Sequence, residues 1–164
     1  MRTPRRGQAI AAAWVLILAP PLAVVVKLSV YPGWMMFAAF LAGIPLLIGY
    51  ALQIVIAING MFAARGVFTR EPDAGRGILA AWLTSAGVVL VASLIVDGGD
   101  DGTYGSLLTE MLGISSTAGG SDLSMTLVVP AALLWLGGWL WLLVEWIALR
   151  ARSRPPRAAP RSLG

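Results

Sequence analysis

Four long apolar runs dominate this sequence and limit what the chain can fold into. A helix needs about 20 apolar residues to cross a hydrocarbon core of about 30 Å, and each run reaches that length. The runs cover residues 8–30, 35–64, 77–96 and 126–149. Charged residues make up only 12% of the 164-residue chain, whereas soluble domains carry about 25%. The sequence therefore predicts an all-α integral membrane protein whose four transmembrane helices form a compact bundle.

The basic residues predict the orientation of this bundle. In a four-span arrangement all the arginines fall on one side, at positions 2–6, 65–76 and 150–161, and Lys27 alone falls on the other. Arginine and lysine concentrate in cytoplasmic loops. We therefore expect both termini in the cytoplasm and the protein in the cytoplasmic membrane as a multi-pass protein.

The connections at the two ends of the first run are short. Residues 1–7 form a basic N-terminal segment, and residues 31–34 contain a Pro-Gly turn dipeptide, which predicts a tight outer turn. The N-terminal segment with its apolar run also has the features of a signal peptide. The run is long, however, and no A-x-A cleavage pattern follows it. We therefore expect the first run to remain as a helix.

The remaining cytoplasmic segments are residues 65–76, which form a loop, and residues 150–164, which form an Arg/Pro-rich tail. We expect the tail to be disordered. A proline pair lies inside the first run, and a single proline lies inside the second. Pro20 with Pro21 should kink the first helix, and Pro45 should kink the second.

An outer acidic loop, residues 97–125, begins with a stretch that invites comparison with a calcium site. An EF-hand loop needs an oxygen ligand at its third position and a bidentate Glu at its twelfth. Counted from Asp97, these positions hold Gly99 and Leu108. The sequence thus favours a flexible acidic turn and no metal site, with a weak cation site of another kind as the alternative.

Farther along the outer loop, residues 106–113 predict a short surface helix. Ser106 can cap its N-terminus and Gly113 can end it. We expect this helix to shield the top of the bundle; the alternative is a helix that docks a partner.

Small residues at spacings of three, four or seven predict the packing seams of the bundle. One such stripe on the second helix includes Gln53, whose amide should face protein and donate to backbone or hydroxyl acceptors of the third helix, such as Thr84 or Ser85. The stripes are Ala42, Leu46, Gly49, Gln53, Ile56 and Gly60; Gly77, Ala81, Ser85, Val88 and Ala92; and Ala131, Gly138 and Glu145.

Glu145 is the one carboxylate within a run. It lies four residues before the apolar end at Leu149, so an ionised carboxylate there needs a partner or water. Arg152, Arg65 and Arg76 are the candidate partners. The sequence favours a salt bridge that fixes the cytoplasmic end of the bundle, with a proton or cation relay as the alternative.

The chain contains neither cysteine nor histidine. Disulfides, thiol nucleophiles, Ser-His triads and ordinary zinc sites are therefore excluded, and no nucleophile–base pair or ligand cluster stands out within the runs. We expect no enzyme activity and no catalytic, cofactor-binding or metal-binding residue.

The hypothesis for function is an accessory or structural subunit, or an assembly factor, of the membrane. A small transporter or channel that uses Glu145 and Gln53 in a polar path is the first alternative, and a membrane-embedded enzyme is the second. The expected partners are the bilayer, other membrane proteins and the chain itself, and not nucleic acid, because the tail lacks an aromatic residue for stacking on bases. Anionic lipids should bind the tail arginines, which are Arg150, Arg152, Arg154, Arg157 and Arg161.

Overall fold

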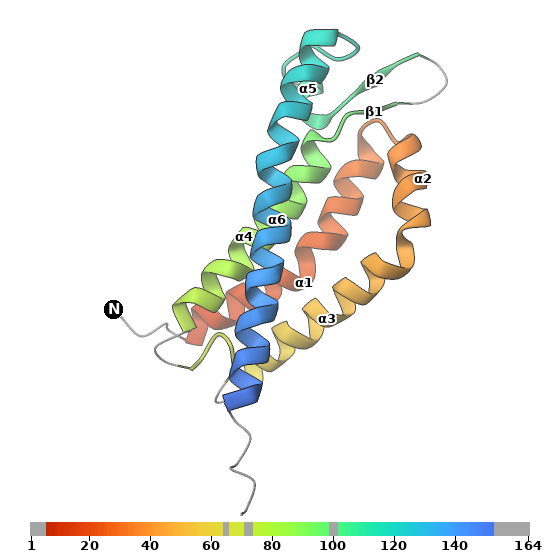
Figure 1. Ribbon diagram of the computed structural model, residues 1–164. Coiled ribbons are helices and arrows are strands. Elements are labelled where there is room, and N and C mark those ends of the chain that lie inside the picture. Colours follow the sequence, from red (N-terminus) through yellow and green to blue (C-terminus); the bar gives the residue numbers. More distant parts are fainter. Residues whose placement is uncertain (1–5, 64–65, 71–73, 99–101, 153–164) are drawn as a thin grey trace, which may run out of the picture.

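The computed structural model describes residues 6–63, 66–70, 74–98 and 102–152, and this part of the chain is mostly helical (Figure 1). The elements are α1 (Arg6–Ser29), α2 (Trp34–Leu41), α3 (Gly43–Phe62), α4 (Ala74–Leu94), β1 (Asp97–Gly98), β2 (Tyr104–Gly105), α5 (Leu107–Met111) and α6 (Ala118–Arg152). Four of these helices, α1, α3, α4 and α6, are long and apolar enough to cross a membrane. The prediction of four such helices is confirmed.

The second apolar run, residues 35–64, is divided between α2 and α3. The two helices meet at Ala42, whose φ of −81° and ψ of 9° depart from helical values. Pro45 explains the break, because its ring clashes with the carbonyl four residues earlier and it has no N–H to donate there. That carbonyl belongs to Leu41, the last residue of α2. The proline therefore interrupts the helix rather than only kinking it.

Within the described residues, the acidic loop is shorter than the sequence predicts and contains regular elements. α6 has 35 residues and begins at Ala118, inside the stretch assigned to the loop. At 1.5 Å per residue it is about 50 Å long, well beyond the thickness of a hydrocarbon core. β1 and β2 form an antiparallel pair in which Asp97 is opposite Gly105. The two strands and the beginning of α6 lie at the top of Figure 1.

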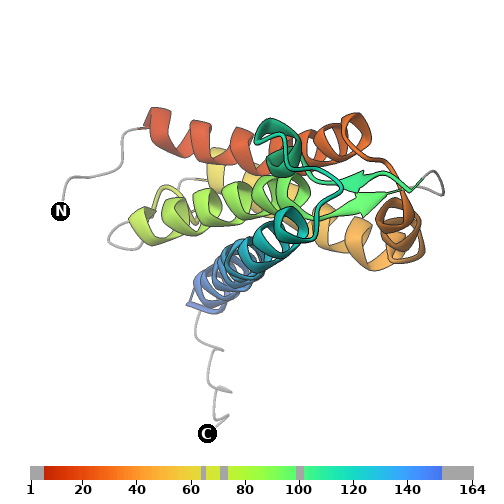
Figure 2. The same ribbon diagram turned by 90° about the horizontal axis from the view of Figure 1, so that it is seen from above.

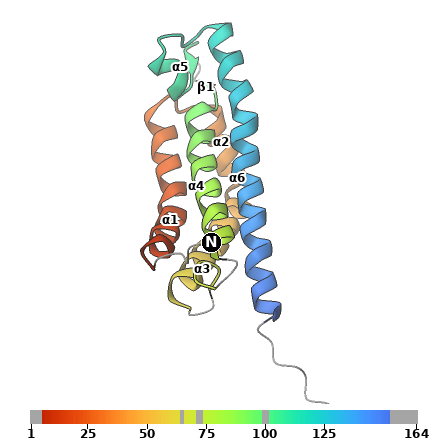
Figure 3. The ribbon, with the colours of Figure 1, turned by 90° about the vertical axis from the view of Figure 1, so that its left-hand side faces the viewer.

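Three of the long helices lie side by side, with α4 between α1 and α6 (Figures 2 and 3). α3 crosses at one side and packs on α1, whereas α2 contacts α3 and β1. Small residues allow the close approach of α4 to α6. A Cβ built on Gly138 would lie 2.7 Å from Thr84 N, and one on Gly87 would overlap the backbone of Trp135.

The seams read from the sequence agree in part with the burial of their residues. On α4 the stripe from Gly77 to Val88 is buried, and on α6 Ala131 and Gly138 are buried. The α3 stripe is buried from Gln53 onward but exposed at Ala42 and Leu46. The seam of α3 is therefore packed only along its second half, by α1 and, at Gly60, by Phe68.

Charge separates the two ends of the molecule. The arginine-rich end, at the bottom of Figure 1, contains Arg6, Arg70, Arg76, Arg150 and Arg152 among the described residues. The acidic end, at the top, contains Asp97, Glu110 and Asp122.

Candidate functional site

A cluster of hydrogen bonds surrounds the two prolines of α1, which continues through Pro20 and Pro21. A proline has no N–H, so each leaves the carbonyl four residues earlier without its helical donor. These carbonyls belong to Leu16 and Ile17, and α3 supplies a donor to each. Gln53 Nε2 lies 2.7 Å from Leu16 O.

The second donor of this cluster is the Tyr50 hydroxyl, which lies 2.8 Å from Ile17 O. Tyr50 and Gln53 are three residues apart, so both side chains project from one face of α3. Two carbonyls that the prolines deprive of their helical donors are thus both satisfied by the neighbouring helix.

Gln53 faces protein, as the sequence predicts, with 3% of its surface exposed. Its partner, however, is on α1 and not on α4, so the expected bond to Thr84 or Ser85 is wrong. Thr84 Oγ1 instead donates to Ala80 O. Ser85 Oγ is buried and, among the described residues, has no hydrogen-bond partner. The proline pair was the signal that could have identified the acceptors of α1.

A second cluster lies near the arginine-rich end and is centred on Glu145. Arg76 Nη2 is 2.8 Å from Glu145 Oε1, and Trp141 Nε1 donates to the same oxygen at 3.1 Å. The Glu145 side chain is 12% exposed and that of Arg76 is 61% exposed. The carboxylate is therefore largely withdrawn from solvent and bound to α4 through a cation that remains in solvent.

Of the three candidate partners for Glu145, the structure brings Arg76 to it. Arg152 lies exposed in the last turn of α6, and Arg65 lies outside the described residues. One turn below, the Arg150 guanidinium lies 4.1 Å from the centre of the Trp146 ring, a cation–π contact.

A third cluster, at the acidic end, is one that the sequence reasoning missed. Asp97, assigned there to a flexible turn, is only 6% exposed, and Lys27 near the end of α1 is 7% exposed. Lys27 Nζ lies 3.5 Å from Asp97 Oδ2 and donates to Ile95 O at 3.2 Å. Asp100 and Asp101, assigned to the same turn, lie outside the described residues. The sequence contained a signal for this pair, because Lys27 is the one basic residue that the four-span arrangement places on the side opposite the arginines.

Backbone N–H groups complete the surroundings of the Asp97 carboxylate. Gly33 N donates to Oδ2 at 3.2 Å, and Met35 N donates to Oδ1 at 3.1 Å. The residue that follows, Gly98, also donates to Oδ1, at 3.0 Å. Gly33 precedes α2 and Met35 lies in its first turn. Asp97 therefore holds the beginning of α2 while it pairs with α1.

Close backbone contact makes glycine necessary in this cluster. A Cβ on Gly33 would overlap the carbonyl of Gly98 and lie 2.7 Å from Asp97 Oδ1. Tyr31, at the start of the same turn, adopts a φ of +48°, in the left-handed region. The turn between α1 and α2 is thus tightly packed on β1.

Hydroxyl groups attach the short helix α5 to the long helices. Ser106 caps α5, as the sequence predicts, and forms a capping box with Thr109. Its Oγ lies 2.7 Å from Ser124 Oγ, which donates to Leu94 O at 2.6 Å. Gly113 ends this segment with a φ of +68°. The chain after α4 is therefore fixed to both α4 and α6.

Glu110 occupies the solvent side of this segment. Tyr31 OH donates to Glu110 Oε2 at 2.7 Å, and Ser115 Oγ donates to it at 3.0 Å. These two hydrogen bonds, that from Tyr31 first, lower the pKa of Glu110 from its ordinary value. The carboxylate so joins the α1–α2 turn to the segment after α5.

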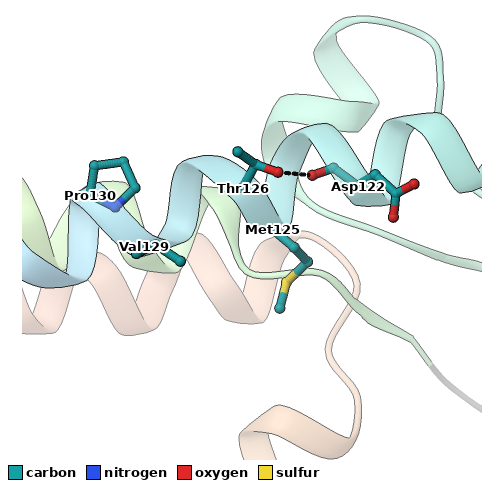
Figure 4. A pocket seen from close by; sticks show the side chains of 5 residues that line it. All are labelled: Asp122, Met125, Thr126, Val129 and Pro130. Carbon is teal, nitrogen blue, oxygen red and sulfur yellow. Dashed lines mark hydrogen bonds between the residues drawn. The ribbon is translucent and has the colours of Figure 1, made fainter.

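A hollow on the acidic half of α6 is lined by Asp122, Met125, Thr126, Val129 and Pro130 (Figure 4). All five come from one face of a single helix. Thr126 Oγ1 already donates to Asp122 O at 2.7 Å. No second element contributes a lining residue within the described part of the chain, so we assign no ligand to this hollow.

Comparison with known proteins identifies no relative. No protein-family model, no curated protein and no solved structure matches the chain. Within the residues that the structure describes, no group of three or more acidic side chains is placed to hold a metal ion. The three clusters therefore carry the functional argument.

Proposed function

We propose that this chain is a structural or accessory subunit, or an assembly factor, of the cytoplasmic membrane. In this proposal four helices cross the bilayer, with the arginine-rich end and both termini in the cytoplasm. The arginine distribution supports the orientation, because basic residues concentrate in cytoplasmic segments. The partners are other membrane proteins or further copies of the chain.

The observation that carries the proposal is that Gln53 and Glu145, the two side chains a transport path would use, bond to the bundle itself, as does Tyr50. Gln53 and Tyr50 donate to carbonyls of α1, and Glu145 accepts from Arg76 and Trp141. A transport path built on Gln53 and Glu145 would have to break these bonds during each transport cycle. Each broken bond would leave a polar group unpaired in an apolar environment. Their arrangement is that of groups that hold helices together.

Anionic lipids are the proposed partners of the arginine-rich end. Arg150 and Arg152 are exposed in the last turn of α6, and the remaining tail arginines, Arg154, Arg157 and Arg161, lie outside the described residues. Each basic residue near an anionic surface contributes about 1 kcal/mol of attraction. This contact would anchor the bundle without a dedicated lipid pocket.

Reconstitution into liposomes tests the proposal against transport. The purified protein, Glu145→Gln and the matched variant Arg76→Gln are each placed in vesicles that carry a pH or sodium gradient. We expect gradients to decay as in protein-free vesicles for all three. We also expect the two variants to lose similar stability. Flux that the unaltered protein supports and Glu145→Gln abolishes, while Arg76→Gln retains it, would overturn the proposal in favour of a relay.

A second measurement addresses the subunit role itself. The chain is extracted in mild detergent, and the mass of the purified particle is determined by size exclusion with light scattering. Proteins that copurify with the chain in a defined ratio are identified in the same preparation. A stable assembly with itself or with a membrane protein supports the role. A monodisperse monomer that copurifies with no protein at any detergent concentration contradicts it.

A further inference from the structure

We propose that α2 is a movable arm of this fold and that the Asp97 carboxylate is the latch that holds it. This inference concerns a conformational device and goes beyond the role proposed for the whole chain. It depends on three properties of α2, which are its few contacts, its hydrogen-bonded beginning and its interrupted end.

The contacts of α2 are confined to α3 and β1 among the elements it packs against substantially. Its large apolar side chains are exposed, with Trp34 at 67%, Phe37 at 57% and Phe40 at 82%. In Figure 1 the helix stands apart from α6, at the edge of the molecule. Side-chain packing therefore contributes little to its position.

α2 has eight residues, so it makes few helical hydrogen bonds of its own. Its first N–H groups also lack partners within the helix. Asp97 supplies an acceptor for the N–H of Gly33 and for that of Met35. The beginning of α2 is thus held by a side chain 62 residues away in sequence.

The other end of α2 offers a pivot. The helix stops at Leu41, and α3 begins at Gly43 with Pro45 in its first turn. A Cβ on Gly43 would meet no atom within 4 Å, so the break is not wedged by neighbouring side chains. Farther along, α3 is fixed to α1 by Tyr50 and Gln53. Motion of α2 therefore stops where those bonds begin.

Lys27 makes the latch dependent on the packing of α1 against α4. Lys27 Nζ joins Asp97 to the carbonyl of Ile95 just after α4. A shift of α1 relative to α4 would withdraw the ammonium group and weaken the hold on α2. The device thus converts a small displacement of the packed helices into release of an exposed aromatic arm.

Spin-label distances in nanodiscs test the latch, since the chain has no native cysteine to compete for label. One pair of labels, at Phe40→Cys and Leu79→Cys, reports α2 against α4. A reference pair, at Leu18→Cys and Leu79→Cys, reports α1 against α4. All three positions are exposed. Asp97→Asn opens the latch, because the amide keeps one acceptor oxygen but turns a donor toward Gly33 N or Lys27. Asp122→Asn, an exposed acid at the same end, is the matched control.

In Asp97→Asn we expect the α2–α4 distance distribution to broaden well beyond its width in the unaltered protein, while the α1–α4 distribution stays narrow. Asp122→Asn should change neither. An α2–α4 distribution that stays narrow in Asp97→Asn would overturn the proposal, as would equal broadening of both pairs, which would mean that Asp97 supports the whole bundle.

Gly33→Ala provides a second variant should Asp97→Asn fail to fold. It retains the buried charges and only forces the start of α2 away from Gly98 and Asp97. We expect the same selective broadening. A narrow α2–α4 distribution in this variant would contradict the latch.

Discussion

Among the described residues, an ion pair joins two separate elements at each end of the molecule, and the two pairs differ in burial. Arg76 and Glu145 are 61% and 12% exposed in their side chains, whereas Lys27 and Asp97 are 8% and 2% exposed. Exposed pairs contribute about 0.2–1 kcal/mol, but loss of one partner of a buried pair costs about 3–5 kcal/mol. Burial, and not the shorter distance at the arginine-rich end, should therefore decide which end is more sensitive.

The largest effect should come from Lys27→Met. It leaves the Asp97 carboxylate buried with only backbone donors, and we expect the free energy of unfolding to fall by about 3–5 kcal/mol. Denaturant unfolding in detergent measures this loss. The double variant Lys27→Met/Asp97→Asn should recover part of it, because no charge is then left buried. A double variant less stable than both single variants would show that the buried, unpaired charge is not the cause of the loss.

Between the two ends, Gln53→Leu should lower the free energy of unfolding by about 0.6–2 kcal/mol, which is the range for hydrogen bonds between helices in a membrane. The variant leaves Leu16 O without a donor. Pro20→Ala restores an N–H that can reach the same carbonyl, so Gln53→Leu should cost less in that background.

Pro21→Ala is the matched control for this cycle. It restores a donor to Ile17 O, the partner of Tyr50, and should reduce the cost of Tyr50→Phe but not that of Gln53→Leu. Equal rescue by both proline substitutions would show that helix straightening, and not the freed carbonyls, sets the effect.

At the arginine-rich end, Glu145→Gln and Arg76→Gln should each lower the free energy of unfolding by about 1 kcal/mol or less. Trp141 can still donate to the side-chain amide oxygen that Glu145→Gln introduces, which limits the loss in that variant. The double variant should cost little more than either alone, and added salt should reduce all three effects. A loss from either single variant as large as that of Lys27→Met would contradict the role given to burial.

The smallest effect concerns Glu110, an exposed acid at the acidic end. Its pKa is lowered in the folded state by hydrogen bonds from Tyr31 and Ser115. Its contribution to stability is therefore present above the pKa of the unfolded chain and is lost as pH falls through the folded value. Melting temperature followed from neutral to acid pH should show this decline, and Tyr31→Phe should reduce it. If the melting temperature of Tyr31→Phe falls with pH as it does in the unaltered protein, the hydrogen bond from Tyr31 to Glu110 is not the cause of the decline.

The parts of this structure that follow from local pattern were predictable. The lengths of the apolar runs predict the four long helices, and Ser106 with Gly113 predicts α5. The polarity of Gln53 predicts its burial, and the position of Glu145 near a helix end predicts an arginine partner.

The parts that depend on contacts between distant segments were not predictable in the same way. Asp97 and Lys27 are 70 residues apart, and no local pattern pairs them. The acceptors of Gln53 and Tyr50 were implied by the proline pair, but the choice of α3 as donor depends on how α3 crosses α1. The break at Ala42 arises because the effect of Pro45 on the preceding turn is not offset by neighbouring helices.

Cysteine accessibility tests most directly the central claim that the arginine-rich end lies in the cytoplasm and the acidic end outside. Gly75 at the start of α4 and Gly119 at the start of α6 are both exposed, and a Cβ at either would meet no atom within 4 Å. A membrane-impermeant maleimide applied to intact cells should label Gly119→Cys and should label Gly75→Cys only after the membrane is permeabilised. Labelling of Gly75→Cys in intact cells would contradict the cytoplasmic location of the arginine-rich end.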